Sequence, residues 1–207
     1  MEFPKGSCIY SGTPEALYMV ACGRVKVSMT AENGGEAIVK IVPPECLFGE
    51  SFMTGSISHE RAVALDRVQL MTWKRAEIEQ QIEREPRLGL ALLEALIEAT
   101  LEMQERIHAM AVCKTPQRVM LSLLHLAESL GERQADGALR MNPLTHHLIA
   151  AHVGTSREIV STQMSRLRRL GLVRYSRKHI DVYGDAVRDM LQRQGFPAQR
   201  GHSAAAA

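Results

Sequence analysis

The chain has 207 residues, of which 45% are apolar and 23% charged, and its formal net charge is +2. This apolar content suffices for a packed core without disulfides or metal, and the near-neutral charge excludes a uniformly basic, histone-like nucleic-acid binder. The charges are nevertheless uneven, because residues 77–105 are rich in Glu whereas residues 157–177 are rich in Arg and poor in acids. This asymmetry predicts an anionic partner for the C-terminal third.

No apolar run approaches the roughly 20 residues of a membrane span, and residues 1–5 lack the apolar core of a signal peptide. A cytoplasmic protein without membrane partners is therefore expected. The cysteines form no C-x-x-C pair and have no histidine at zinc-ligand spacing, which favours free thiols over a metal or iron–sulfur site. They are Cys8, Cys22, Cys46 and Cys113.

Residues 1–75 have the pattern of a β domain. Residues 25–29 alternate apolar and polar as in a half-buried strand, and residues 37–42 form the expected return strand. Residues 32–35 contain Asn-Gly, which is typical of a tight hairpin. Many short strands between Gly and Pro turns predict a sandwich or jelly roll. Further strands are expected at residues 17–20, 62–65 and 68–73.

A long helix is expected from about Pro86, since strand alternation stops before it. Apolar positions then recur at alternating steps of three and four, as at the a and d positions of a coiled coil. We therefore expect self-association through this seam, ahead of packing on the chain's own β domain. Thr115-Pro116 ends the helix at a hinge. The predicted dimer interface consists of Leu93, Leu96, Thr100, Met103, Ile107 and Met110.

A second helix is expected over residues 117–129, and residues 131–142 form a loop or short hairpin. Thr145 then caps a short helix, and Gly154 is a turn residue that tolerates positive φ. A further helix opens at residues 155–158. This pattern predicts a helix-turn-helix, whose second helix enters the major groove of DNA.

The second helix of this motif carries residues suited to base recognition. Arg157 can donate two hydrogen bonds to guanine, and Glu158 can accept one from cytosine. Glu158 also lies three residues after Thr155, which is the spacing of a capping box, and both interpretations of Glu158 stay open.

Residues 170–183 predict two short strands joined by a basic turn, a wing whose tip contacts phosphates. A merely solvated Arg-rich face is the alternative, but the scarcity of acids favours DNA contact. The predicted DNA-binding residues are Thr145, His146, Thr155, Ser156, Arg157, Glu158, Ser161, Thr162, Arg166, Arg177 and Lys178.

Three segments of the chain resemble the Crp/Fnr family of bacterial transcription regulators. They are Gly154-Thr155-Ser156-Arg157-Glu158, Leu167-Arg168-Arg169-Leu170-Gly171-Leu172-Val173 and Phe48-Gly49-Glu50. The resemblance covers nearly the whole chain. It implies an α+β fold with an N-terminal β jelly-roll (cyclic-nucleotide-binding-like) domain, a long dimerisation helix and a C-terminal winged helix-turn-helix. The implied domains span 1–84, 85–113 and 114–190, followed by a disordered tail over 191–207.

The resemblance also implies an effector pocket in the β domain. In cAMP-binding members an Arg-Ser pair holds the cyclic phosphate, and here these positions fall on Ser58 and His59, with Arg61 three residues out of place. Because neither residue supplies a permanent cation, we expect weak or absent cAMP binding and no cofactor. Heme sensing through His59 or a cysteine is the less favoured alternative. The predicted pocket residues are Gly49, Glu50, Ser51, Ser58, His59, Met103 and Gln104.

Together these features predict a sequence-specific DNA-binding regulator that acts as a homodimer on a palindromic operator, under an effector other than cAMP. Constitutive DNA binding without an effector is the alternative, and a ligand-binding or scaffolding module is less favoured. No Gly-rich phosphate loop, G-x-S-x-G elbow or metal-spaced cluster occurs, so neither an enzyme nor a metal site is predicted. RNA polymerase is a possible further partner.

Overall fold

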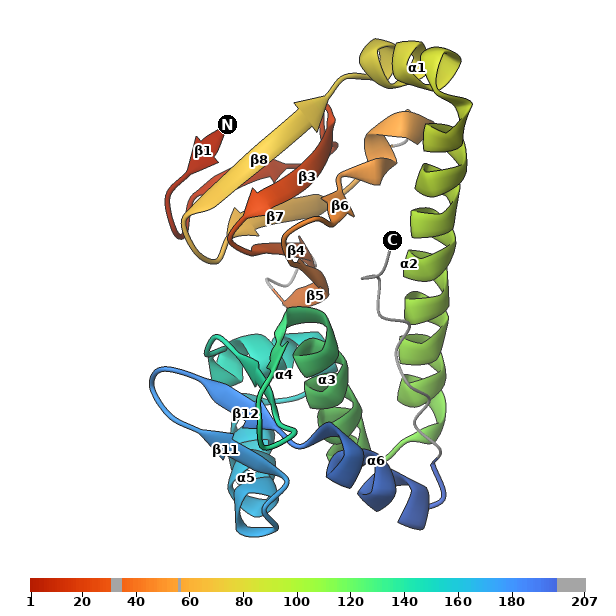
Figure 1. The fold of residues 1–207 in the computed structure, drawn as a ribbon. Helices are drawn as coiled ribbons and strands as arrows, with labels where there is room; N and C mark the ends of the chain where they lie inside the picture. The colour runs from red at the N-terminus through yellow and green to blue at the C-terminus, as the bar shows by residue number, and fades with distance from the viewer. Residues whose placement is uncertain (31–34, 56, 197–207) are drawn as a thin grey trace. The chain divides into compact units, whose positions relative to one another are not determined.

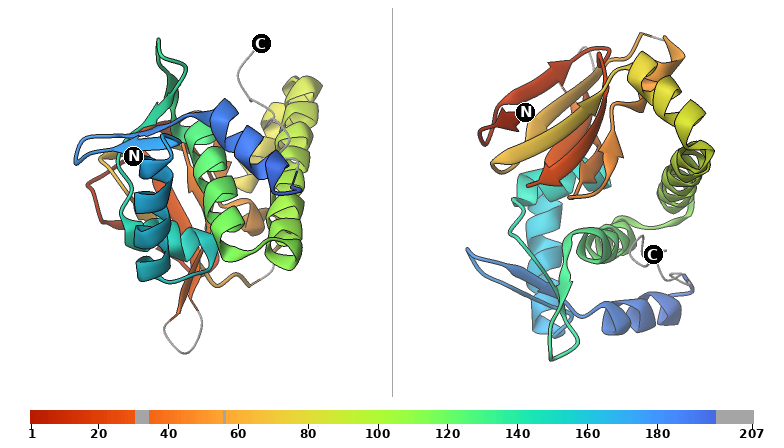
Figure 2. Two further views of the ribbon diagram at one scale, coloured as in Figure 1. Left: turned by 90° about the horizontal axis from the view of Figure 1, so that it is seen from below. Right: turned by 45° about the horizontal axis from the view of Figure 1, so that its top comes forward.

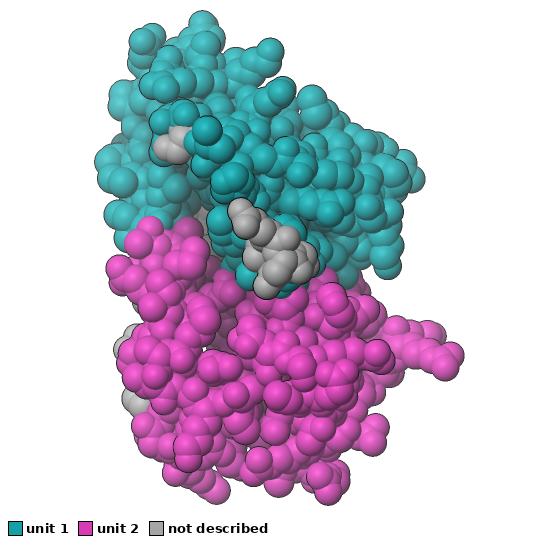
Figure 3. Space-filling model, turned by 180° about the vertical axis from the view of Figure 1, so that it is seen from behind, with its two compact units in different colours: residues 1–97 teal, residues 98–207 magenta. Residues whose placement is uncertain are grey.

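The computed structural model describes residues 1–30, 35–55 and 57–196, and it divides into two compact units (Figure 1, Figure 3). The first unit comprises residues 1–97, and the second begins at Glu98. The division falls inside the long helix α2 (Pro86–Val112).

The first unit is a β sandwich. Within the described residues it has two antiparallel four-stranded sheets, of order β1-β8-β3-β6 and β2-β7-β4-β5. The two sheets share one core of fully buried side chains, which include Val20, Val25, Phe48, Ala62 and Val68. This core between two sheets confirms the predicted fold. The strands are β1 (Glu2–Phe3), β2 (Cys8–Ser11), β3 (Leu17–Cys22), β4 (Val25–Thr30), β5 (Glu36–Val42), β6 (Leu47–Phe48), β7 (Glu60–Ala64) and β8 (Val68–Trp73).

The predicted hairpin is present as a strand pair. β4 and β5 pair from Val25 opposite Val42 to Thr30 opposite Glu36, with one register shift after Val27. The turn predicted at residues 32–35 lies, apart from Gly35, outside the described residues.

Two short helices of the first unit were not predicted: η1 (Glu50–Thr54) and α1 (Arg75–Arg84). In α1 the carboxylate of Glu77 accepts a hydrogen bond from the main-chain N of Lys74 (2.7 Å). This bond to the main chain marks the helix start, although Ile78 is the one buried residue of α1.

The second unit surrounds α3 (Thr115–Leu130) with α4 (His146–Val153), α5 (Arg157–Arg169), α6 (Gly184–Arg193) and a small sheet. The sheet has the order β11-β12-β10-β9, and Figure 2 shows α5 beside the β11–β12 hairpin. Its strands are β9 (Glu132–Arg133), β10 (Leu139–Met141), β11 (Val173–Tyr175) and β12 (Ile180–Val182). The short hairpin predicted within residues 131–142 is therefore formed by β9 and β10.

Two helix boundaries differ from the predictions. α3 begins at Thr115 rather than at Gln117, because Pro116 fits the first turn of a helix. α6 continues through Arg193, so the prediction of disorder from residue 191 is wrong for its last turn. Val187 and Leu191 are buried and hold this helix in place. Residues 197–207 of the predicted tail lie outside the described residues.

In the described part of the chain, no helix combines the length and the apolar character needed to cross a membrane. The same residues contain no cluster of His, Cys, Asp and Glu arranged to hold a metal ion.

Candidate nucleic-acid interface

Residues 154–156 join α4 to α5 in a sharp turn. The hydroxyl of Thr145 accepts a hydrogen bond from the main-chain N of Leu148 (3.1 Å), so it caps α4 as predicted. Gly154 ends α4 at φ 73°, and a Cβ there would meet open space among the described residues. Its backbone conformation alone therefore favours glycine. The geometry is that of a helix-turn-helix.

The start of α5 shows no capping box between Thr155 and Glu158, which was one of the two interpretations of Glu158. Ser156, not Thr155, is the N-cap, since its hydroxyl accepts from the main-chain N of Ile159 (3.4 Å). Glu158 is consequently the second helical residue. The pKa of its carboxyl is lowered, first by its own main-chain N–H and then by the hydroxyl of Ser156, so it stays ionised at neutral pH.

The two sides of α5 differ in kind. Val160, Met164 and Leu167 are at most 3% exposed and anchor the helix. The exposed side chains of α5 are polar apart from Ile159 (41% exposed), and Glu158 is the one acid in α5. The net charge of this surface is thus positive. Of the predicted contact residues in α5, four are exposed and Ser161 is half-buried; the four are Arg157, Glu158, Thr162 and Arg166.

The wing lies where it was predicted. β11 and β12 pair antiparallel, and Arg177 and Lys178 are exposed in the turn between them. The hydroxyl of Ser176 accepts from the main-chain N of Lys178 (3.1 Å) and of His179 (3.3 Å), which fixes the shape of this turn.

One residue of this surface was missed in the sequence. The guanidinium of Arg168 lies over the ring of Tyr175, 5.3 Å from its centroid, and His146 meets the same ring edge-on at 6.0 Å. Tyr175 therefore connects α4, α5 and β11. An aromatic residue next to a basic turn is the signal that could have identified it.

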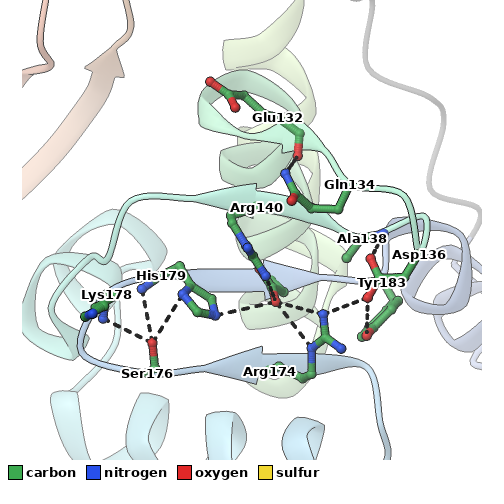
Figure 4. Close-up of polar contacts among 11 residues, drawn as sticks. Glu132, Gln134, Asp136, Ala138, Arg140, Arg174, Ser176, Lys178, His179 and Tyr183 are labelled. Atoms are coloured by element: carbon green, nitrogen blue, oxygen red, sulfur yellow. Dashed lines mark hydrogen bonds and ion pairs between the residues drawn. The ribbon is translucent and has the colours of Figure 1, made fainter.

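A buried carboxylate organises the outer side of the small sheet (Figure 4). Asp181, fully buried on β12, accepts hydrogen bonds from Arg140 of β10 (2.7 and 3.0 Å) and from Arg174 of β11 (2.9 and 3.2 Å). Arg174 also contacts Asp136 (2.7 Å), and His179 lies 3.7 Å from Asp181. The hydrogen bond from Arg140, followed by that from Arg174, lowers the pKa of Asp181. The carboxylate thus joins β10, β11 and β12 of the small sheet.

Replacing Asp181 with Asn should destabilise the second unit by about 1–2 kcal/mol at neutral pH, allowing for the solvent exposure of both arginines. A carboxyl whose pKa is lowered on folding stabilises the fold above its unfolded pKa and loses that effect as pH falls through the folded value. The difference between wild type and Asp181→Asn should therefore shrink below about pH 4. Urea unfolding across pH 3–7 measures it. Asp136→Asn, at an exposed partner of the same cluster, should cost less; equal losses would contradict the central role of Asp181.

In the β domain, Gly49, Glu50 and Ser51 lie together at the start of η1. Gly49 has φ 83°, and a Cβ there would lie 2.8 Å from the ring of Tyr18, so only glycine fits. The carboxylate of Glu50 pairs with Lys40 at 2.5 Å.

The residue that reaches this region from β7 is Glu60. Its Oε2 accepts a hydrogen bond from the hydroxyl of Tyr10 (3.1 Å) and lies 3.5 Å from Oγ of Ser51. Ser58 instead binds Thr13 through its main-chain N (2.9 Å), and among the described residues no hydrogen bond or ion pair joins His59 to Glu50 or Ser51. Arg61 is exposed, on the side of β7 opposite to the buried Ala62. The remaining predicted pocket residues, Met103 and Gln104, are exposed on α2 in the second unit.

α2 presents its apolar residues to the surface. None of its 27 residues, all of which the structure describes, is buried. The apolar seam residues are 44–57% exposed, and Thr100 is exposed as well. Those apolar residues are Leu93, Leu96, Met103, Ile107 and Met110.

Comparisons with known proteins agree with this geometry. The family described as "Cyclic nucleotide-binding domain" matches residues 1–85, and the family described as "Crp-like helix-turn-helix domain" matches residues 117–183. The chain is 31% identical over 183 residues to the cyclic AMP receptor protein of Thermus thermophilus, covering 87% of this chain and 82% of that protein. It is 29% identical over 192 residues to a CRP-like cAMP-activated global transcriptional regulator of Mycobacterium tuberculosis, with the same coverages.

A solved structure supports the same assignment. The crystal structure of a CRP/FNR-family transcriptional regulator from Thermus thermophilus superposes with a TM-score of 0.75 at 26% identity, covering 93% of this chain and 97% of that one.

The second unit is therefore a winged helix-turn-helix DNA-binding domain, and the first is a cyclic-nucleotide-binding-like β domain. The chain belongs to the Crp/Fnr family of DNA-binding transcription regulators, which confirms the resemblance found in the sequence.

Proposed function

We propose that this regulator binds a palindromic DNA operator as a homodimer, with α5 of each protomer in the major groove and the wing tip on the flanking phosphates. The observation that carries the proposal is the polar side of α5, where Arg157 is exposed in the first turn while the opposite side is anchored in the core. An arginine at that point of a recognition helix can read guanine. The role is regulatory and cytoplasmic rather than enzymatic.

Support for the dimer comes from α2. Apolar residues at heptad spacing, each about half exposed in one chain, are the pattern that pairs two helices through a/d packing. Pairing would remove this apolar surface from water and place two copies of α5 at a fixed spacing.

Glu60 supports the part of the proposal that excludes cAMP as the effector. Its carboxylate lies beside Ser51, within the segment that follows Gly49-Glu50, and would repel a cyclic phosphate. Calorimetry should therefore detect no cAMP binding at micromolar concentrations. Two relatives are named for cAMP, so cAMP is the ligand to test first. Micromolar affinity would overturn this part of the proposal. Constitutive DNA binding, without any effector, stays the alternative.

The test of the proposed function is selection of random duplex DNA by the purified full chain. The expected result is an inverted repeat with half-site centres about one helical turn, roughly 34–36 Å, apart, and an affinity that falls steeply with salt. Enrichment of no sequence, or of a single unrepeated site, would contradict the dimeric DNA-binding role.

A further inference from the structure

His146, the first residue of α4, is hydrogen-bonded to the recognition helix. Its Nδ1 lies 2.8 Å from Oγ of Ser161, and the same hydroxyl donates to the main-chain O of Arg157 (2.9 Å). A serine hydroxyl has a single proton to donate. Both bonds are therefore satisfied together only if Nδ1 of His146 carries a hydrogen and donates it to Ser161.

The second ring nitrogen, Nε2, keeps some access to solvent within this chain, since His146 is only half-buried. It has no hydrogen-bond partner in the described part of the chain, and it is not one of the polar side-chain atoms buried there without a partner. With the hydrogen of the neutral ring held on Nδ1, Nε2 presents a lone pair. A lone pair cannot donate to a phosphate oxygen, whereas the protonated ring presents an N–H there.

Among the described residues, the charged group that acts on the ring is Arg157 of α5, and the titratable group in direct contact with it is Tyr175 of β11. Arg168 lies on the same Tyr175 ring. Burial, followed by the positive charge of Arg157, lowers the pKa of His146. In the free protein at neutral pH the ring is consequently neutral. A phosphate at Nε2 would act in the opposite direction, because an anion favours the charged form.

We propose that His146 is a proton-linked phosphate contact, in which DNA binding takes up one proton on Nε2 in each protomer and so becomes tighter as the pH falls. The inference rests on the proposed function. Between the pKa of the free ring and that of the phosphate-bound ring, the affinity should rise by up to about tenfold per pH unit for each His146, hence up to about 100-fold for a dimer. Outside this pH window, titration of His146 should cause no change in the DNA affinity.

The test measures the affinity of the full chain for its selected operator from pH 5.5 to 8.0 at constant ionic strength. Wild type should bind more tightly at low pH, and His146→Gln, which keeps a polar side chain but cannot gain the charge, should lose most of that dependence. His147→Gln, at the exposed neighbour in the same helical turn, is the matched control and should keep the wild-type profile. His146→Arg, charged throughout, should bind at pH 8.0 about as tightly as wild type at its acid limit.

A purely structural role for His146 predicts a different result, since His146→Gln would then lower the affinity equally at every pH. That outcome, or a flat wild-type profile, overturns the inference and leaves the proposed function intact. Failure of wild type to bind any selected operator at any pH overturns the proposed function and this inference with it. Thermal melts of each variant confirm that the fold is retained.

Discussion

Replacing Arg157 with Ala is expected to weaken operator binding by about 1–3 kcal/mol in each half-site, while affinity for random duplex DNA changes little. The side chain is exposed in the first turn of α5 and forms no ion pair among the described residues, so its loss should remove base contacts without disturbing the fold. Titrations of operator and random duplex at one salt concentration measure the ratio of the two affinities.

The matched control for Arg157→Ala is Arg193→Ala, which removes an exposed arginine from the last turn of α6. This control should leave the ratio of specific to random affinity unchanged, because the substitution removes only a screened, long-range attraction between the Arg193 charge and the DNA phosphates. If Arg157→Ala also left the ratio unchanged, α5 would not be the helix that reads bases.

The double variant Leu96→Glu with Ile107→Glu should convert the dimer into monomers and reduce operator affinity by at least about 100-fold. Both residues lie on the seam and are about half exposed in one chain, at 47% and 57%. Pairing would bury the introduced carboxylates opposite their copies, where like charges without water are strongly unfavourable. Sedimentation velocity measures the oligomeric state, and the same samples report DNA affinity.

Leu101→Glu is the control for the seam. Leu101 lies on the same helix and is 49% exposed, but it occupies neither an a nor a d position of the seam. This variant should therefore remain dimeric. A dimer that survives the double substitution but dissociates with Leu101→Glu would place the interface on another side of α2.

The parts of the fold that follow from local periodicity were predictable. The alternation of residues 25–29 indicated β4, the return strand expected at residues 37–42 is β5, and the steps of three and four after Pro86 indicated α2. The sequence from Thr145 through Gly154 likewise located α4 and the turn into α5. α1 was missed since Ile78 is its one buried residue and Lys74, at its N-cap, is not a capping side chain.

Two features of the candidate sites depended on a choice that sequence alone leaves open. Thr155 and Ser156 are both good N-cap residues, and only the geometry shows that Ser156 caps α5. In β7 the buried Ala62 determines which neighbours face the interior, and by period-two alternation this places Glu60 inside and Arg61 outside. The inward and outward alternation of β7 cannot be read from the sequence, because the length of the loop before it is variable. The resemblance therefore assigned the phosphate-binding positions to Ser58 and His59, whereas it is Glu60 that approaches Ser51.

The exposed helix α2 has a consequence for gene dosage. Since none of its residues is buried within one chain, a second molecule that covers α2 would remove this apolar surface from water, and mass action would then govern how many chains are competent for DNA. If α2 pairs as proposed, at low expression the number of pairs grows with the square of the number of chains. Doubling synthesis would then raise promoter occupancy about fourfold, which gives the cell a steep response without any ligand.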